Sequence, residues 1–204
     1  MYARVQRANV PVDLDVAMRQ TVVDTISGHP GFAGLYLLDQ MGVGRRIIVT
    51  LWQTRDEAVG ASGRTRAKLG PRPFELELDE IYEVVDDWSG TAGAESPGAA
   101  AFMQFETPMS QARYDAGQRG AKERIQPALA GHPGAVRALA LWDDEARRFV
   151  VFTFATSIDA LDECGRIANS TDLLPGEDPA LLAGPTRADL CRVVAVVPAP
   201  VAVP

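Results

Sequence analysis

The two histidines are the only imidazoles in the chain, and both lie in the same tetrapeptide. Gly-His-Pro-Gly at 28–31 recurs 103 residues later at 131–134. A histidine pair could hold a metal or move a proton. A glycine followed by a proline also ends a helix, and a histidine beside a helix C-terminus favours the helix dipole. No further ligands converge at a workable spacing, so we expect His29 and His132 to mark two helix exits and expect no metal site.

Four residues of the first half are candidates for lining a pocket: Arg4, Asn9, Tyr36 and Trp52. Arg4 shares one side of a predicted strand with Gln6, and paired polar side chains there could enter a pocket or lie exposed at the strand ends. Asn9 could bond a ligand carbonyl or form a turn. Tyr36 carries a phenol on an apolar strand, so its hydroxyl could orient a substrate or reach solvent. Trp52 could contact a ligand or cap the core.

The positions of these candidates follow from a repeat that continues without a gap. Residues 45–51 align with 148–154, and Asp56 aligns with Asp159. A match of this length indicates one folded unit used twice. In this register Trp52 is replaced by Ala155, and the space so freed could be a pocket or could be filled from elsewhere. Leu139 replaces Tyr36, so the halves are expected to share a fold but not a pocket.

Each half is predicted to fold as β-α-β-β-α-β, the ferredoxin-like split motif. Strands are expected at 1–7, 32–39, 46–53 and 74–85, and then at 101–106, 132–142, 148–156 and 189–197. Strand parity places Ile48, Thr50 and Trp52 toward the helices and leaves an apolar opposite face. The fold class is therefore α+β, with two ferredoxin-like repeats forming an intramolecular pseudo-dimeric α+β barrel. The expected boundaries are repeats at 1–87 and 101–197, a linker at 88–100 and a tail at 198–204.

The second helix of the first half is expected to pack loosely. It begins with Thr54-Arg55-Asp56-Glu57, the spacing of a capping box, and runs to about Leu69. The helix itself contains few large apolar residues, so little apolar surface can hold it against the sheet.

Composition excludes several classes of protein. A net charge of −7 and a pI near 4.9, with scattered arginines, argue against nucleic-acid binding. No apolar run reaches the ~18 residues of a membrane span, and the N-terminus lacks the apolar core of a signal peptide. Cys164 and Cys191 are expected to be reduced thiols, which favours a cytoplasmic protein. The sequence leaves a monomer and a homodimer both open.

The pattern Pro30-Gly31-Phe32, a hairpin, a strand ending in Leu51-Trp52 and then Asp56-Glu57-Ala58 resembles the antibiotic-biosynthesis monooxygenase (ABM) family. The resemblance implies a dimeric α+β barrel, reached here by tandem fusion rather than by the homodimerisation usual in that superfamily. It implies a cofactor-independent monooxygenase that acts on a hydrophobic aromatic or polyketide-like small molecule, with Arg4, Asn9, Tyr36 and Trp52 around the site.

Two alternatives stay open. One is a non-catalytic small-molecule-binding or interaction protein of the same fold. The other is haem binding or degradation, but relatives that degrade haem carry a histidine soon after the strand-end tryptophan, and residues 61–63 contain none.

Overall fold

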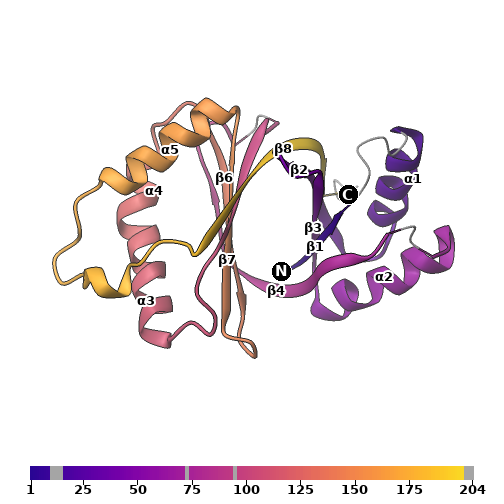
Figure 1. Ribbon diagram of the computed structural model, residues 1–204, viewed down its shortest axis with the longest axis horizontal. Helices are drawn as coiled ribbons and strands as arrows, with labels where there is room; N and C mark the ends of the chain where they lie inside the picture. The colour runs from indigo at the N-terminus through magenta and orange to yellow at the C-terminus, as the bar shows by residue number, and fades with distance from the viewer. Residues whose placement is uncertain (10–15, 72–73, 94–95, 200–204) are drawn as a thin grey trace, which may run out of the picture. The chain divides into compact units, whose positions relative to one another are not determined.

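The computed structural model describes residues 1–9, 16–71, 74–93 and 96–199 (Figure 1). The chain divides into two compact units. The first comprises Met1–Val84 with Arg192–Pro204, and the second comprises Val85–Cys191.

The first unit is an antiparallel sheet with two helices on one face (Figure 1). In chain order it contains β1 (Tyr2–Asn9), α1 (Val16–Ser27), β2 (Phe32–Gln40), β3 (Arg45–Trp52), α2 (Arg55–Leu69) and most of β4 (Leu76–Ser89). The central strand β3 pairs with β1 and β2 and holds the residues of interest. A buried cluster that includes Val23, Ile26, Leu35, Leu37 and Trp52 lies between this sheet and its helices.

The second unit repeats this order. It contains β5 (Ala99–Gln104), α3 (Gln111–Gly120), a π-helical turn η1 (Ala121–Ile125), α4 (Gln126–Leu129), β6 (Ala135–Asp143), β7 (Arg148–Ala155), α5 (Ile158–Ser170), a 3₁₀ turn η2 (Pro179–Leu181) and the start of β8 (Arg187–Pro198). Three successive helical segments, α3, η1 and α4, thus run from Gln111 to Leu129. The π-helical turn follows directly after Gly120, a residue that stabilises a regular helix poorly.

The hydrogen-bonded strand order is β1-β3-β2-β8-β5-β7-β6-β4, and it closes on itself because β4 also pairs with β1. The strands β4 and β8 each begin in one unit and end in the other. The chain thus has an α+β fold with eight antiparallel strands in a closed order, as the sequence predicts.

The expected linker at 88–100 is shorter in the structure. Trp88 and Ser89 still belong to β4, and β5 already begins at Ala99. The segment after β4 continues to bond β6, since the Gly90 and Ala92 amides donate to Val136 and Ala135 carbonyls at 3.0 and 2.9 Å. These backbone bonds extend the pairing with β6 beyond Ser89. Of the expected tail, Pro198 ends β8, and residues 200–204 lie outside the described residues.

The repeated tetrapeptide makes the same backbone bonds in both units. The His29 amide donates to Ile26 and the Gln53 amide to Gly31, at 3.1 and 2.8 Å. Their counterparts 103 residues on are His132 to Leu129 and Thr156 to Gly134, at 3.0 Å each. The tetrapeptide therefore ends a helix and supports the start of the later helix, which confirms its structural role at both exits.

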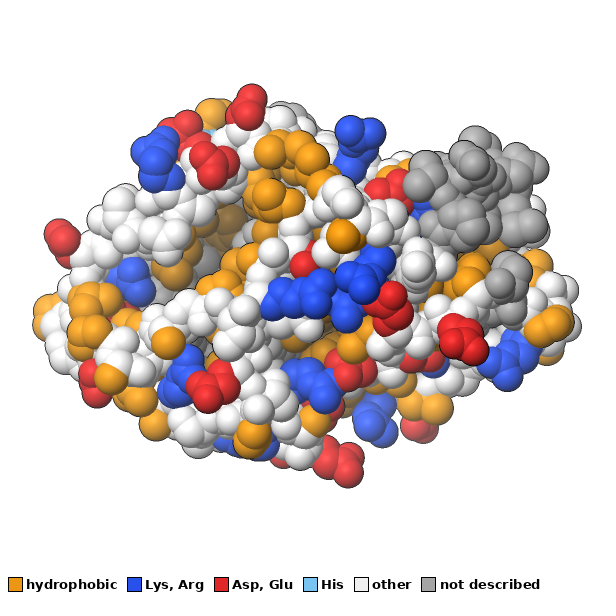
Figure 2. Space-filling model, viewed as in Figure 1, with side chains coloured by type: hydrophobic (Ala, Val, Ile, Leu, Met, Phe, Trp, Pro, Cys, Tyr) orange, Lys and Arg blue, Asp and Glu red, His pale blue; other side chains and the backbone are white. Residues whose placement is uncertain are grey.

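The surface face in Figure 2 carries basic and acidic side chains next to one another, with hydrophobic side chains between them. In the described part of the chain, no helix is both long enough and apolar enough to cross a membrane.

Candidate functional site

A cavity of about 430 Å³ lies between the helices and the sheet of the first unit. Its floor is formed by alternate residues of β1, β2 and β3 with Leu76 of β4, and its cover by α1, α2 and the segment that leads to β4. The lining is mostly apolar and comprises Arg4, Gln6, Ala8, Thr21, Val22, Val23, Ile26, Leu35, Leu37, Arg46, Ile48, Thr50, Trp52, Ala61, Ser62, Thr65, Arg66, Leu69, Gly70, Pro71, Phe74 and Leu76. This volume falls within the range of small-molecule sites.

The composition of α2 explains why the space is left open. The helix begins with the expected capping box, in which Thr54 and Glu57 satisfy each other's backbone amides. Its only described buried residues are Ala58 and Ala61. Ala61 lines the cavity, and its short side chain cannot fill the space beside it.

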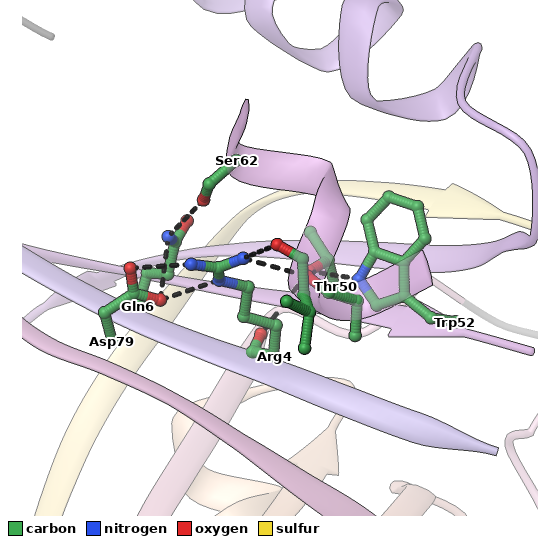
Figure 3. Close-up of polar contacts among 8 residues, drawn as sticks. Arg4, Gln6, Thr50, Trp52, Ser62 and Asp79 are labelled. Carbon is green, nitrogen blue, oxygen red and sulfur yellow. Dashed lines mark hydrogen bonds and ion pairs between the residues drawn. The ribbon is translucent and has the colours of Figure 1, made fainter. Parts of the chain in front are cut away.

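Trp52 forms one end of the cavity. Its side chain is 0% exposed, and its indole Nε1 donates to the Thr50 hydroxyl at 2.8 Å (Figure 3). Phe32 packs edge-to-face against the indole, with ring centroids 5.9 Å apart. The indole hydrogen bond is thus satisfied internally.

Arg4 ties the floor of the cavity to α2 and β4. Its Nε and Nη2 donate to the two Asp79 carboxylate oxygens at 2.7 and 2.8 Å, and Nη1 donates to the carbonyls of Ala58 and Val59 (Figure 3). A two-point arginine–carboxylate pair is a strong and directional contact. The charge of Arg4 is therefore compensated by Asp79, which makes Arg4 mainly a structural tie.

Gln6 completes this polar corner. Its amide nitrogen donates to Asp79 at 3.0 Å and to Ser62 at 3.3 Å (Figure 3). Because an ionised carboxylate only accepts hydrogen bonds, the contact with Asp79 fixes the amide orientation. The corner thus presents an amide and a hydroxyl beside a neutralised ion pair.

Two of the four predicted site residues lie elsewhere. Tyr36 pairs with Val49 in the β2–β3 register and so lies on the sheet face opposite the helices. Asn9 is exposed at the end of β1, opposite Arg45. Arg4 and Trp52 do line the cavity, so the structure brings together only half of the predicted set.

Three lining or supporting residues were missed from the sequence. Arg46 has the same strand parity as Trp52, which was a usable signal. Ser62 and Asp79 accept hydrogen bonds from Gln6 but lie on elements far from it in the sequence. No local sequence pattern predicts these contacts.

His29 lies behind the cavity wall. Its Nε2 is 3.1 Å from the hydroxyl of Thr65, which is itself a lining residue. Burial lowers the pKa of His29, and the nearby Arg64 and Lys68 charges lower it further. The ring is therefore held neutral and supports α2.

His132 has a different neighbour. Its Nδ1 accepts from the Gly134 amide at 3.1 Å and lies 3.5 Å from the Cys164 sulfur. Burial, and secondarily Glu163, raise the pKa of the Cys164 thiol. A raised pKa favours the thiol over the more nucleophilic thiolate. In the described part of the chain, no group of three or more His, Cys, Asp or Glu side chains is placed to hold a metal ion.

The second unit exchanges large and small residues at the equivalent place. Ala155 stands where Trp52 would be, and Leu161 stands where Ala58 would be. Ala155 and Leu161 are both buried in one cluster with Ala99 and Ala101. The small side chain on β7 thus packs with a larger one on α5.

No family model matches the chain, and no curated protein matches it. Solved structures do share its fold. One is an anthrone oxidase-like protein, with 12% identity, 97% of this chain and 93% of that chain covered, and a TM-score of 0.61. Another is a provisionally named monooxygenase from Fusobacterium nucleatum subsp. nucleatum, with 11% identity, 97% and 94% covered, and a TM-score of 0.61.

A third is a heme-degrading enzyme from Listeria monocytogenes, with 8% identity, 94% and 99% covered, and a TM-score of 0.52. At these identities the likeness establishes the fold and leaves the activity to the site.

Proposed function

We propose that the chain is a cofactor-independent monooxygenase of the ABM type, which oxidises a hydrophobic aromatic or polyketide-like small molecule in the cavity of the first unit. The observation that carries this proposal is the mostly apolar cavity of about 430 Å³ that ends at Trp52. The name of the anthrone oxidase-like neighbour suggests the substrate class.

The proposed chemistry uses the substrate as the electron donor. A hydroxyanthrone loses the proton from its methylene carbon, and the resulting enolate passes one electron to O₂. The two radicals combine as a peroxide at that carbon, and loss of water leaves the quinone. One anthrone and one O₂ thus give one anthraquinone and one water. A dry, preorganised site favours the charge transfer.

The lining suggests how the proton leaves. None of the described lining residues is a His, Asp or Glu. A solvent base must then take the proton. The oxidation rate should therefore rise with pH in proportion to the ionised fraction of the substrate. Trp52 and Ile48 would hold the rings, and the amide of Gln6 would orient a polar edge.

The same observation favours a second candidate function, which is small-molecule binding without turnover. The cavity would suit an aromatic ligand whether or not it reacts. Haem is a weaker candidate, because no described lining residue is a His, Cys or Tyr, three of the usual iron ligands.

We also propose that the two units are tandem copies of one ferredoxin-like repeat in a cytoplasmic protein. The matching backbone bonds at a spacing of 103 residues and the Trp52–Ala58 exchange for Ala155–Leu161 support a duplication. Only the first copy would keep a ligand site.

The experiment is an oxidation assay with 1,8-dihydroxyanthrone. O₂ uptake and quinone formation are followed with and without the protein, and the anaerobic reaction is the control. We expect O₂-dependent quinone formation at a 1:1 ratio and above the uncatalysed rate. Saturable binding without rate enhancement would favour the binding protein instead. A Soret shift on adding haemin, lost when the cavity is filled, would favour haem.

A further inference from the structure

Arg46 stands at the end of the cavity remote from Trp52. In the sheet register it lies opposite Asp39 on β2 and Ala8 on β1, and Ala8 in turn lies opposite Leu76 on β4. Trp52 lies six positions further along β3 than Arg46, which corresponds to about 20 Å between their Cα atoms.

This end of the cavity reaches solvent. Arg66 and Leu69 on the last turns of α2 line it and are both exposed, Leu69 at 40%. A ligand could enter here and extend along β3 toward the indole.

The Arg46 side chain is buried but uses little of its bonding capacity. The residue is 6% exposed, and its Nε donates to an Asp39 carboxylate oxygen at 2.7 Å. In the described part of the chain, the two terminal nitrogens of Arg46 donate to no residue. Neither of these nitrogens is fully enclosed by protein atoms. They therefore reach open space in the cavity that Arg46 lines.

Arg4 provides the contrast. It lines the same cavity, but all three of its guanidinium nitrogens donate to Asp79 or to α2 carbonyls. Burying an arginine is unfavourable unless its donors find partners. Arg46 has only the carboxylate of Asp39, whose side chain is 41% exposed and thus partly screened by water.

We propose that Arg46 is the anchor for an anionic oxygen of the ligand, a carboxylate or an ionised phenol or enolate, at the solvent end of the cavity. The terminal nitrogens of a guanidinium form a planar fork that matches two oxygens. The rings of the ligand then lie on the apolar lining toward Trp52. This inference rests on the proposed function only in that the ligand occupies this cavity.

The test uses two fluorescent probes that differ in one group, anthracene-2-carboxylate and 2-(hydroxymethyl)anthracene. Both are titrated into the wild-type chain and three variants, Arg46→Met, Arg45→Met and Asp39→Asn. Arg45 is the matched control, because it is the neighbour on β3 and pairs with Glu77 outside the cavity lining. Ala61→Leu, which narrows the cavity, checks that the probes bind inside it.

We expect Arg46→Met to weaken binding of the carboxylate about tenfold or more, as the loss of a charged hydrogen bond would, and to leave the alcohol unchanged. Arg45→Met should change neither. Asp39→Asn removes the anion that competes for Arg46 and should strengthen binding of the carboxylate probe. This variant keeps the inference testable if Arg46→Met does not fold.

Equal carboxylate binding in the wild type and Arg46→Met, or no gain in Asp39→Asn, would overturn the anchor. If the alcohol still binds and still responds to Ala61→Leu, the cavity and the proposed function survive that result. If neither probe binds, or if Ala61→Leu has no effect, the cavity itself fails as a ligand site.

Discussion

Ala61→Leu should stabilise the protein, because Ala61 lies on α2 and lines the cavity. Leucine adds three carbon groups, and burying each contributes about 0.8 kcal/mol, or about 2.4 kcal/mol in all. Fixing the leucine rotamer costs about 0.5–1 kcal/mol. The expected net gain in the free energy of unfolding is therefore about 1.5 kcal/mol.

Ala58→Leu is the matched control. Ala58 lies one helical turn earlier, is 0% exposed and is not a lining residue. A larger side chain there enters a packed region and should destabilise the protein by about 1–3 kcal/mol. The two variants make the same chemical change on the same helix, so only the free space differs.

Urea unfolding followed by circular dichroism measures both variants. The decisive quantity is the sign of the change for Ala61→Leu. If this variant is destabilised as much as Ala58→Leu, the space beside Ala61 is already filled, and the cavity does not exist in solution.

Two further predictions concern the repeated tetrapeptide. Gly31 has a φ of +71°, and an added Cβ would lie 1.9 Å from the Glu57 carboxyl carbon, whereas Gly42 at φ +80° has nothing within 4 Å. Gly42→Ala should therefore cost only the backbone penalty of about 1–2 kcal/mol. Gly31→Ala should cost more, because the displaced Glu57 carboxylate would lose its hydrogen bonds to the amide and hydroxyl of Thr54; equal losses in urea unfolding would contradict this reasoning. The second prediction is a pH effect. The pKa of His29 is lowered in the folded protein, so as the pH falls the unfolded chain takes up this proton before the folded chain does. The contribution of neutral His29 to the free energy of unfolding is therefore fully present above about pH 6.5 and is lost as the pH falls. His29→Gln should lose less stability than the wild type between about pH 7 and pH 5, and parallel pH curves would show that His29 is not the titrating group.

Strand periodicity predicted the floor of the cavity well. Trp52 and Thr50 point to the helices because side chains alternate along β3, and Arg4 and Gln6 follow the same rule on β1. The sequence of α2 contains few large apolar side chains, which predicted loose packing. The cavity lies beside the small residues of this helix.

Tyr36 does not line the cavity, and the reason is the pairing between two strands. Its face depends on the β2–β3 register, which pairs it with Val49 and includes an irregularity between Phe32 and Gly34. A shift of one residue in register would move a side chain to the other face. The type and spacing of residues on β2 alone could not settle that choice.

Arg46 and Asp79 show a second limit. An arginine at a strand start suggests a solvated charge, and only the three-dimensional cover makes Arg46 buried. Asp79 meets Arg4 across 75 residues of sequence. Such long-range pairings leave no periodic signal in a single chain.

The central claim is that an aromatic small molecule binds in the cavity of the first unit. The most direct measurement is an anaerobic titration of 1,8-dihydroxyanthrone against the wild type and Ala61→Leu, because it separates binding from turnover. The account predicts saturable 1:1 binding to the wild type that is at least about tenfold weaker in Ala61→Leu, a difference of about 1.4 kcal/mol. Equal binding to both proteins, or no binding to the wild type, would contradict it.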